Sequence, residues 1–157
     1  MNLPDEKPET GVARQVACTD TFRLSIGNAI GEIGKVIDLL EVELGARRIP
    51  SELVHQTQTV ADELVTNVIR HGYRDDRPHT IEVIVGVNAD GLMLHLSDDG
   101  IPFNPFDRPA PDLTHPMGEP KTGGMGLHLV RQLASDCCYS RVGGQNQVTV
   151  VLRHPVP

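Results

Sequence analysis

The sequence contains few aromatic residues and no basic clusters, and both shortages exclude classes of function. Tryptophan is absent, and aromatic residues make up only 3% of the 157 positions. A stacking platform for single-stranded nucleic acid is hard to build from so few rings, and the core must be aliphatic. The formal net charge is −7 and no strongly basic run occurs, so we expect no nucleic-acid partner.

Long apolar runs and spaced cysteine pairs are also absent. No stretch is as long as the roughly 18 apolar residues that cross a bilayer, and the first residues are acidic where a signal peptide would be basic. Cys18, Cys137 and Cys138 fit neither a disulfide framework nor a spaced zinc site, so we expect reduced core cysteines. These features predict a soluble, cytoplasmic protein without a membrane partner.

Length and local composition predict one domain with a short tail. A chain of 157 residues can bury one sizeable core. Residues 1–12 contain two prolines and four charged side chains, with little to bury, so we expect a flexible N-terminal tail there. Residues 13–157 would form the domain, with an edge strand between Val12 and Thr21.

Apolar periodicity predicts three helices. Apolar residues recur every three or four positions over Phe22–Leu44, the spacing of one helix face, although three glycines interrupt the segment. Pro50-Ser51 is a start signal for a second helix that continues to about His71. The segment Gly126–Ala134 returns to helical spacing.

Alternating apolar residues predict two hairpins. Thr80–Asn88 and Leu92–Leu96 flank the turn residues Asp90-Gly91, and Cys138–Val142 and Val148–Leu152 flank Gly143-Gly144. The expected fold class is α+β, a two-layer sandwich with helices on one face of a mixed, mostly antiparallel sheet. Six prolines forbid regular structure between residues 101 and 121, a loop so long that it is either functional or disordered.

The second predicted helix carries a polar stripe, in the segment ADELVTNVIRHGY. Glu63, Asn67 and His71 follow one another at intervals of four, so they share one helix face beside the apolar face. A solvated polar face would have the same pattern. Asparagine is, however, a poor residue for the middle of a helix, which favours a role for its side chain, such as oxygen ligation of Mg²⁺.

Two further segments are candidates for ligand contacts. In LSDDGIPFNP, Asp98 shares a strand face with Leu96 and should point to the core, either as a turn cap before Gly100 or as an acceptor for a ligand amino group. In TGGMGLHLVRQL, closely spaced glycines precede a helix, where backbone N–H groups can meet phosphates. No Walker A sequence is present.

Together the three segments resemble the motifs of the Bergerat-fold ATPases, the superfamily shared by gyrase, heat-shock chaperone and sensor-histidine-kinase ATP domains. Glu63-x-x-x-Asn67 resembles the N box, Asp98-x-Gly100 the first glycine box and Gly124-x-Gly126-Leu127 the second. The proline-rich stretch between the glycine boxes resembles the ATP lid. The resemblance extends over residues 20–153.

Two details narrow the resemblance. His71-Gly72-Tyr73 follows the N box, and the chain ends in a Gly-Gly-x-x-x-Val-Thr-Val strand. This compact form is most similar to the anti-sigma-factor serine kinases of bacterial partner-switching systems. The resemblance implies ATP and Mg²⁺ as cofactors, with Asn67 as the metal ligand and Glu63 as the catalytic group that orients or deprotonates the attacking hydroxyl.

The resemblance also implies the remaining contacts to the nucleotide. Asp98 would accept the adenine amino group, Thr149 could support that contact, and His71 is either structural or a phosphate contact. Arg108 and Lys121 are the basic residues of the lid, and one of them should meet the γ-phosphate. The residues implied in backbone or loop contacts are Gly100, Thr122, Gly123, Gly124, Met125, Gly126 and Leu127.

The implied function is an ATP-dependent serine/threonine protein kinase that phosphorylates a small anti-sigma-factor antagonist and also sequesters a sigma factor or an equivalent target. The competing interpretation is a non-catalytic ATP-binding switch module. Glu63 favours the kinase, because a pure binding module needs no carboxylate beside the metal ligand. A sensor histidine kinase fragment would need an acceptor histidine, which the first predicted helix lacks. The identity of the partners and formation of a homodimer, common in the family, stay open.

Overall fold

The computed structural model describes residues 17–107 and 125–156. Five strands form one sheet, in which β1 (Asp20–Gly27), β2 (Thr80–Asn88), β3 (Gly91–Asp98), β5 (Gln145–Arg153) and β4 (Asp136–Val142) follow one another in space. Every pairing among these strands is antiparallel. The two-layer α+β prediction is confirmed, and the described sheet contains no parallel pair.

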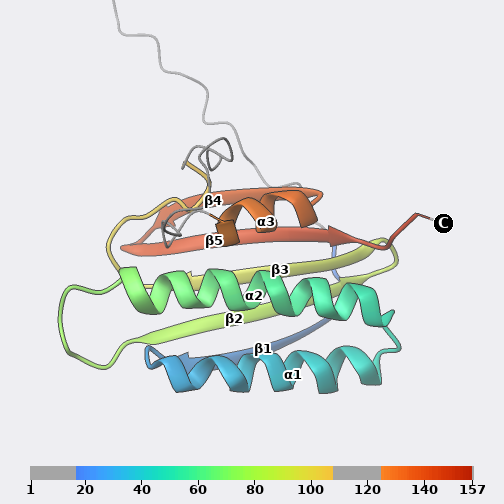
Figure 1. Ribbon diagram of the computed structural model, residues 1–157, viewed down its shortest axis with the longest axis horizontal. Helices are drawn as coiled ribbons and strands as arrows, with labels where there is room; N and C mark the ends of the chain where they lie inside the picture. The colour runs from blue at the N-terminus through green and yellow to red at the C-terminus, as the bar shows by residue number, and fades with distance from the viewer. Residues whose placement is uncertain (1–16, 108–124, 157) are drawn as a thin grey trace, which may run out of the picture.

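Three α-helices cover one face of this sheet. They are α1 (Ile33–Ala46), α2 (Ser51–His71) and α3 (Met125–Leu133). In Figure 1, α1 lies over β1, α2 crosses the centre of the sheet and α3 lies over β5 and β4. The three predicted helices are therefore present, as are both predicted hairpins. No helix in the described parts of the chain is long and apolar enough to span a bilayer.

The first predicted helix begins too early. Residues 20–27 form β1, a short 3₁₀ helix follows at Ile30–Glu32, and α1 begins only at Ile33. Phe22, Leu24 and Ile26 alternate along β1, and Ile26 pairs with Ile81 of β2. Phe22 and Ile26 are four residues apart, so the apolar pattern of this segment is compatible with a helix as well as with a strand. The expected strand at 12–21 overlaps β1 only at its last two residues, and residues 12–16 and the tail lie outside the described residues.

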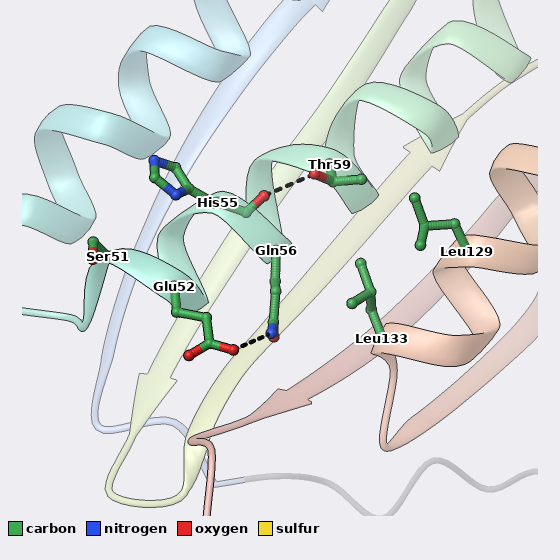
Figure 2. A pocket seen from close by; sticks show the side chains of 7 residues that line it. All are labelled: Ser51, Glu52, His55, Gln56, Thr59, Leu129 and Leu133. Atoms are coloured by element: carbon green, nitrogen blue, oxygen red, sulfur yellow. Dashed lines mark hydrogen bonds between the residues drawn. The ribbon is translucent and has the colours of Figure 1, made fainter.

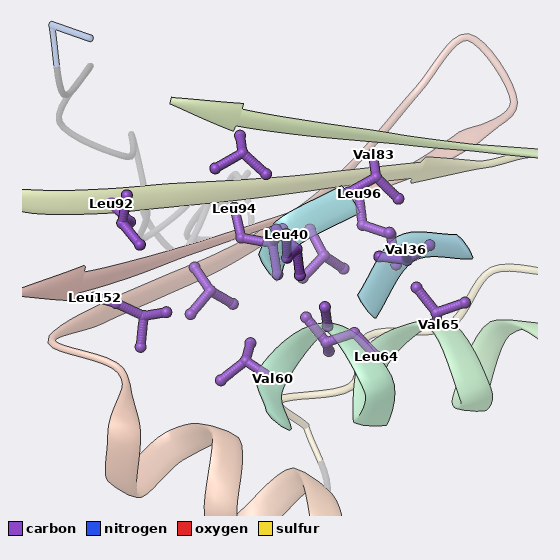
Figure 3. Close-up of a cluster of buried hydrophobic side chains, with 14 of the residues drawn as sticks. Val36, Leu40, Val60, Leu64, Val65, Val83, Leu92, Leu94, Leu96 and Leu152 are labelled. Atoms are coloured by element: carbon purple, nitrogen blue, oxygen red, sulfur yellow. The ribbon is translucent and has the colours of Figure 1, made fainter. Parts of the chain in front are cut away.

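The core lies between the helices and the sheet and is aliphatic, as predicted. Leu40 of α1 and Leu64 of α2 face Leu94 and Leu96 of β3, and each is at most 2% exposed. Figure 3 shows these side chains between the two layers. The cysteines are free thiols and half-buried, and Cys137 packs against the core, so the expectation of core cysteines is wrong only for Cys18 and Cys138. Because α2 packs over the centre of the sheet, Asn67 of its polar stripe lies next to the last residue of β3 and the start of β5.

Candidate functional site

Asp98 lies at the end of β3, and its side chain points to the core face as predicted. The residue is only 4% exposed. Its Oδ1 accepts hydrogen bonds from the backbone N–H of Gly100, at 2.9 Å, and from Nδ2 of Asn146, at 3.0 Å. No other described residue donates a hydrogen bond to this carboxylate, so its second oxygen is available to a ligand donor. Both readings of Asp98, as a turn cap and as an acceptor, are compatible with this geometry.

A narrow pocket surrounds Asp98. Asn67 of α2 lies on its polar side together with Asp98 and Asn146, and the other walls are mostly apolar. The apolar and backbone walls are Leu64, Val68, Gly72, Leu96, Ile101, Phe103, Pro105 and Val148. The space inside is about 20 Å³, room for roughly one water molecule. A planar base needs more space than this, so the pocket must widen before a base can enter.

The loop after α2 is fastened to the strand end beside Asp98. The N–H of Ile101 donates to the carbonyl oxygen of Gly72 at 2.8 Å. A Cβ on Gly100 would lie 2.5 Å from the same oxygen and 2.8 Å from Oδ1 of Asp98. Any side chain at position 100 would force the two segments apart, so the close contact between them requires glycine at this position of the first glycine box.

A second set of contacts holds this loop through His79. Its ring stacks on Tyr73 with the centroids 4.1 Å apart. Nε2 of His79 lies 2.7 Å from Oδ1 of Asp75, and Nδ1 lies 3.1 Å from Oδ1 of Asp99. The hydrogen bond with Asp75 is the main cause that raises the pKa of His79, and the same contact lowers the pKa of Asp75 to about 2. Asp99, next to Asp98, is thereby linked to the loop.

Asn67 and Glu63 lie on one stripe of α2, as the spacing predicted. Nδ2 of Asn67 donates to the backbone carbonyl oxygen of Glu63 at 2.8 Å. A carbonyl oxygen only accepts hydrogen bonds, so the atom of Asn67 that faces it must be the amide nitrogen. The amide oxygen, Oδ1, then points away from this carbonyl and has no hydrogen-bond partner among the described residues. An amide oxygen beside a carboxylate is the donor set that Mg²⁺ prefers, so the stripe fits that ion.

Glu63 lies against the start of α3. A Cβ on Gly126 would collide with the Glu63 carboxylate, so the N box and the second glycine box touch at this point. Burial raises the pKa of Glu63, neighbouring Asp62 raises it further, and Arg70 lowers it. A desolvated carboxylate with a raised pKa is a better proton acceptor than an exposed one.

Other predicted site residues lie elsewhere or outside the described residues. His71 is exposed at the end of α2 and does not line the pocket. The side chain of Leu127 is a core residue, so only its backbone could meet a phosphate. Met125 begins α3. The remaining predicted contacts, Arg108, Lys121, Thr122, Gly123 and Gly124, lie outside the described residues.

The assignment of Thr149 to the adenine contact is wrong. Thr149 pairs with His95 across β3 and β5, and its Oγ1 lies 2.9 Å from Nδ1 of that histidine. Successive side chains of a strand point to opposite faces, so Thr149 faces away from the layer that contains buried Val148 and Val150. Asn146 is the polar residue of β5 that lines the pocket, because it pairs with Asp98 and is 4% exposed.

Asn146 and its partners Tyr139 and Arg141 were missed in the sequence. The hydroxyl of Tyr139 donates to Oδ1 of Asn146 at 2.7 Å, and Nη1 of Arg141 donates to the same atom at 2.8 Å. The available signal was register, since strands flanking Gly143-Gly144 place Arg141 opposite Asn146. Pairing of β5 with β3, which puts Asn146 beside Asp98, is a long-range contact that the sequence pattern does not specify.

A larger groove lies between α2 and α3, away from the motifs (Figure 2). It encloses about 480 Å³ and is lined by Ser51, Glu52, His55, Gln56, Thr59, Leu129 and Leu133. Glu52 accepts a hydrogen bond from Gln56 there, and Leu129 is partly exposed. Its α2 residues, from Ser51 to Thr59, belong to the first half of that helix, whereas Asn67 lies near the other end, so the groove is separate from the pocket beside Asp98.

The comparisons with known proteins agree with this geometry. The family described as "Histidine kinase-like ATPase domain" matches residues 28–152. The chain belongs to this family. It is 28% identical over 97 residues to the serine/threonine-protein kinase BtrW of Bordetella bronchiseptica, covering 62% of this chain and 68% of that protein. It is 30% identical over 140 residues to the serine-protein kinase RsbW of Bacillus mycoides, covering 83% of this chain and 75% of the relative.

A solved structure shares the fold. The crystal structure of the RsbU and RsbW domains of Rv1364c from Mycobacterium tuberculosis aligns with a TM-score of 0.58 and 15% identity, covering 86% of this chain and 32% of that one. The resemblance to a Bergerat-type ATPase of the anti-sigma-factor kinase group is thereby confirmed. Membership in this family implies the use of ATP.

Proposed function

We propose that this chain transfers the γ-phosphoryl group of ATP to a serine or threonine of a small antagonist protein, and that it separately sequesters a sigma factor or an equivalent target. The observation that carries the proposal is the proximity of three motifs in the folded chain. Asp98, Asn67 and the start of α3 are distant in sequence, yet Asp98 and Asn67 line one pocket and Glu63 touches Gly126. The kinase relatives support transfer to a hydroxyl group.

The residues present fit a magnesium nucleotide. Asp98 supplies a buried acceptor in a mostly apolar pocket, which suits an amino group at the edge of a purine. Asn67 supplies an amide oxygen turned away from its own helix. Bound Mg²⁺ would neutralise charge on the phosphate oxygens during transfer.

The proposed mechanism assigns separate tasks to Asp98, Asn67 and Glu63. Asp98 would bind and orient the base, and Asn67 would hold the metal. Glu63 aligns the incoming hydroxyl and takes its proton, a task favoured by the raised pKa of this carboxylate. Gly126 leaves the space in which that carboxylate sits.

A labelling experiment tests the proposal. The purified chain is incubated with magnesium and ATP labelled at the γ-phosphate, together with a lysate of the source cell, and labelled proteins are separated and identified. We expect one small protein labelled on serine or threonine, and no labelling with Glu63→Gln. ATP binding without label transfer to any protein would contradict the kinase and support the non-catalytic ATP-binding switch module.

A further inference from the structure

Asn146 is a buried amide whose hydrogen-bonding groups are all in use. Its Nδ2 donates to Oδ1 of Asp98, at 3.0 Å, and to the carbonyl oxygen of Ile101, at 2.8 Å. Its Oδ1 accepts from Tyr139, Arg141 and the N–H of Phe103. An amide has two N–H donors and one oxygen, so no polar group of Asn146 is left for a ligand. The residue therefore acts on the pocket through its neighbours.

The neighbours determine which way the amide points. Arg141 carries a permanent positive charge and only donates hydrogen bonds, so it must face Oδ1 of Asn146. Its guanidinium also donates to the carbonyl oxygens of Gly100 and Gly144, both at 3.0 Å. A flipped amide would put two donors together at Arg141 and two acceptors together at Asp98. Arg141 thus keeps Nδ2 of Asn146 directed at Asp98.

This arrangement makes the two oxygens of Asp98 different. Oδ1 accepts hydrogen bonds from the Asn146 amide and from the N–H of Gly100, whereas no described residue donates a hydrogen bond to Oδ2. We propose that Asn146, oriented by Arg141, is a positioning residue that reserves Oδ2 of Asp98 for the amino group of a purine and thereby sets adenine selectivity. This inference rests on the proposed ATP site. β3, β5 and β4, which carry Asp98, Asn146 and Arg141, are neighbours in the sheet (Figure 1).

The variant Asn146→Asp tests the inference, because it keeps the shape of the side chain and replaces the N–H donors by an oxygen. Two carboxylates at hydrogen-bond distance must share one proton, and the shared proton restores a donor toward Asp98. The ionisable groups near this pair are Asp98 on β3, Tyr139 and Arg141 on β4, and Tyr73 after α2. Arg141 lowers the pH at which the proton is lost.

The measurement is the ATP dissociation constant of the variant divided by that of wild type, from pH 5 to pH 8. The ratio cancels the titration of the nucleotide itself. We expect a ratio within about threefold at the acid end and a rise of about tenfold or more toward pH 8, as the shared proton is lost. A purely structural role gives a ratio that does not change with pH, and that result would overturn the inference.

A second measurement uses the triphosphate of purine riboside, which lacks the amino group. Asn146→Ala should weaken ATP binding about tenfold and this analogue by much less, because only ATP uses Oδ2 of Asp98. Ser97→Ala is the matched control, since Ser97 donates to Gln145 across the same two strands. Equal weakening of both nucleotides would overturn the inference and leave the ATP site standing. A wild-type chain that binds no ATP would contradict the proposed function itself.

Discussion

The two parts of the proposed nucleotide site differ in how their side chains are held. At the base end, Asp98 and Asn146 are each 4% exposed and lie in a network that crosses three strands. At the proposed phosphate end, Asn67 makes one hydrogen bond among the described residues, to its own helix, and Glu63 and Asn67 are only partly buried. The base end is therefore preorganised by the fold, whereas the chemistry depends on side chains that keep some freedom.

This difference separates binding from transfer. A buried acceptor whose partners are already in place contributes mainly to affinity, because it makes the same contact before and during the reaction. A carboxylate that aligns a nucleophile contributes mainly to rate. Changes at the two ends should consequently have different kinetic effects, and the substitutions below test that separation in order of expected size.

Asn67→Ala should have the largest effect. It should change both binding and transfer, because a metal ligand serves both. We expect Mg-ATP affinity to fall about ten- to a hundredfold and phosphoryl transfer to fall further. Calorimetry and a transfer assay check the two quantities. Thr66→Ala is the control, since Thr66 bonds to Asp62 on the same helix. Unchanged Mg-ATP affinity in Asn67→Ala would contradict the metal assignment.

Asp98→Asn should weaken ATP binding about ten- to a hundredfold. A charged acceptor becomes a neutral amide, and a hydrogen bond to a charged group is worth about 1.5–3 kcal/mol. The rate of transfer at saturating ATP should change much less. Asp90→Asn, in the exposed turn between β2 and β3, is the control. Wild-type affinity in Asp98→Asn, measured by calorimetry, would show that Asp98 does not bind the base.

Gly126→Ala should reduce transfer about tenfold, because its Cβ would displace the Glu63 carboxylate. The control is Gly45→Ala in α1, where a Cβ meets no atom within 4 Å. That control should stabilise the fold by about 0.5–1 kcal/mol, as alanine favours a helix over glycine. Thermal unfolding and transfer assays check the pair, and equal behaviour of both variants would contradict the contact between Glu63 and Gly126.

His79→Gln should have the smallest effect, a change in the pH dependence of stability. Asp75 and Asp99 raise the pKa of His79, so the contribution of its charge is fully present below the ordinary pKa of histidine. It is lost as the pH rises through the raised pKa. Melting temperatures from pH 5 to pH 8 should show wild type exceeding the variant at acid pH, with the gap closing as the pH rises. A gap that widens with pH would contradict the assignment.

The residues that the sequence predicted well are those whose signal is local. The stripe of Glu63 and Asn67 follows from helical spacing, and the burial of Asp98 follows from alternation with Leu96. Both hairpins follow from their turn residues, and Gly143 and Gly144 indeed adopt positive φ angles of 59° and 79°. Each of these inferences needs only neighbours in the chain.

The errors concern segments whose structure depends on distant partners. β1 contains Phe22, Leu24 and Ile26 in alternation, but pairing with β2 decides that they form a strand. Thr149 and Asn146 lie three residues apart, so they point to opposite faces, and only the register with β3 shows which one meets Asp98. Arg141 could not be identified as part of the site before that register was known.

The most direct test of the central claim is Glu63→Gln, which keeps the volume of the side chain and removes its basic oxygen. The paired measurement is ATP affinity by calorimetry and phosphorylation of the small antagonist protein by gel shift, for wild type and variant. We expect wild-type affinity for Mg-ATP and a loss of transfer of about 10²–10⁴. Normal phosphorylation by the variant would contradict the role of Glu63 and the separation of binding from chemistry.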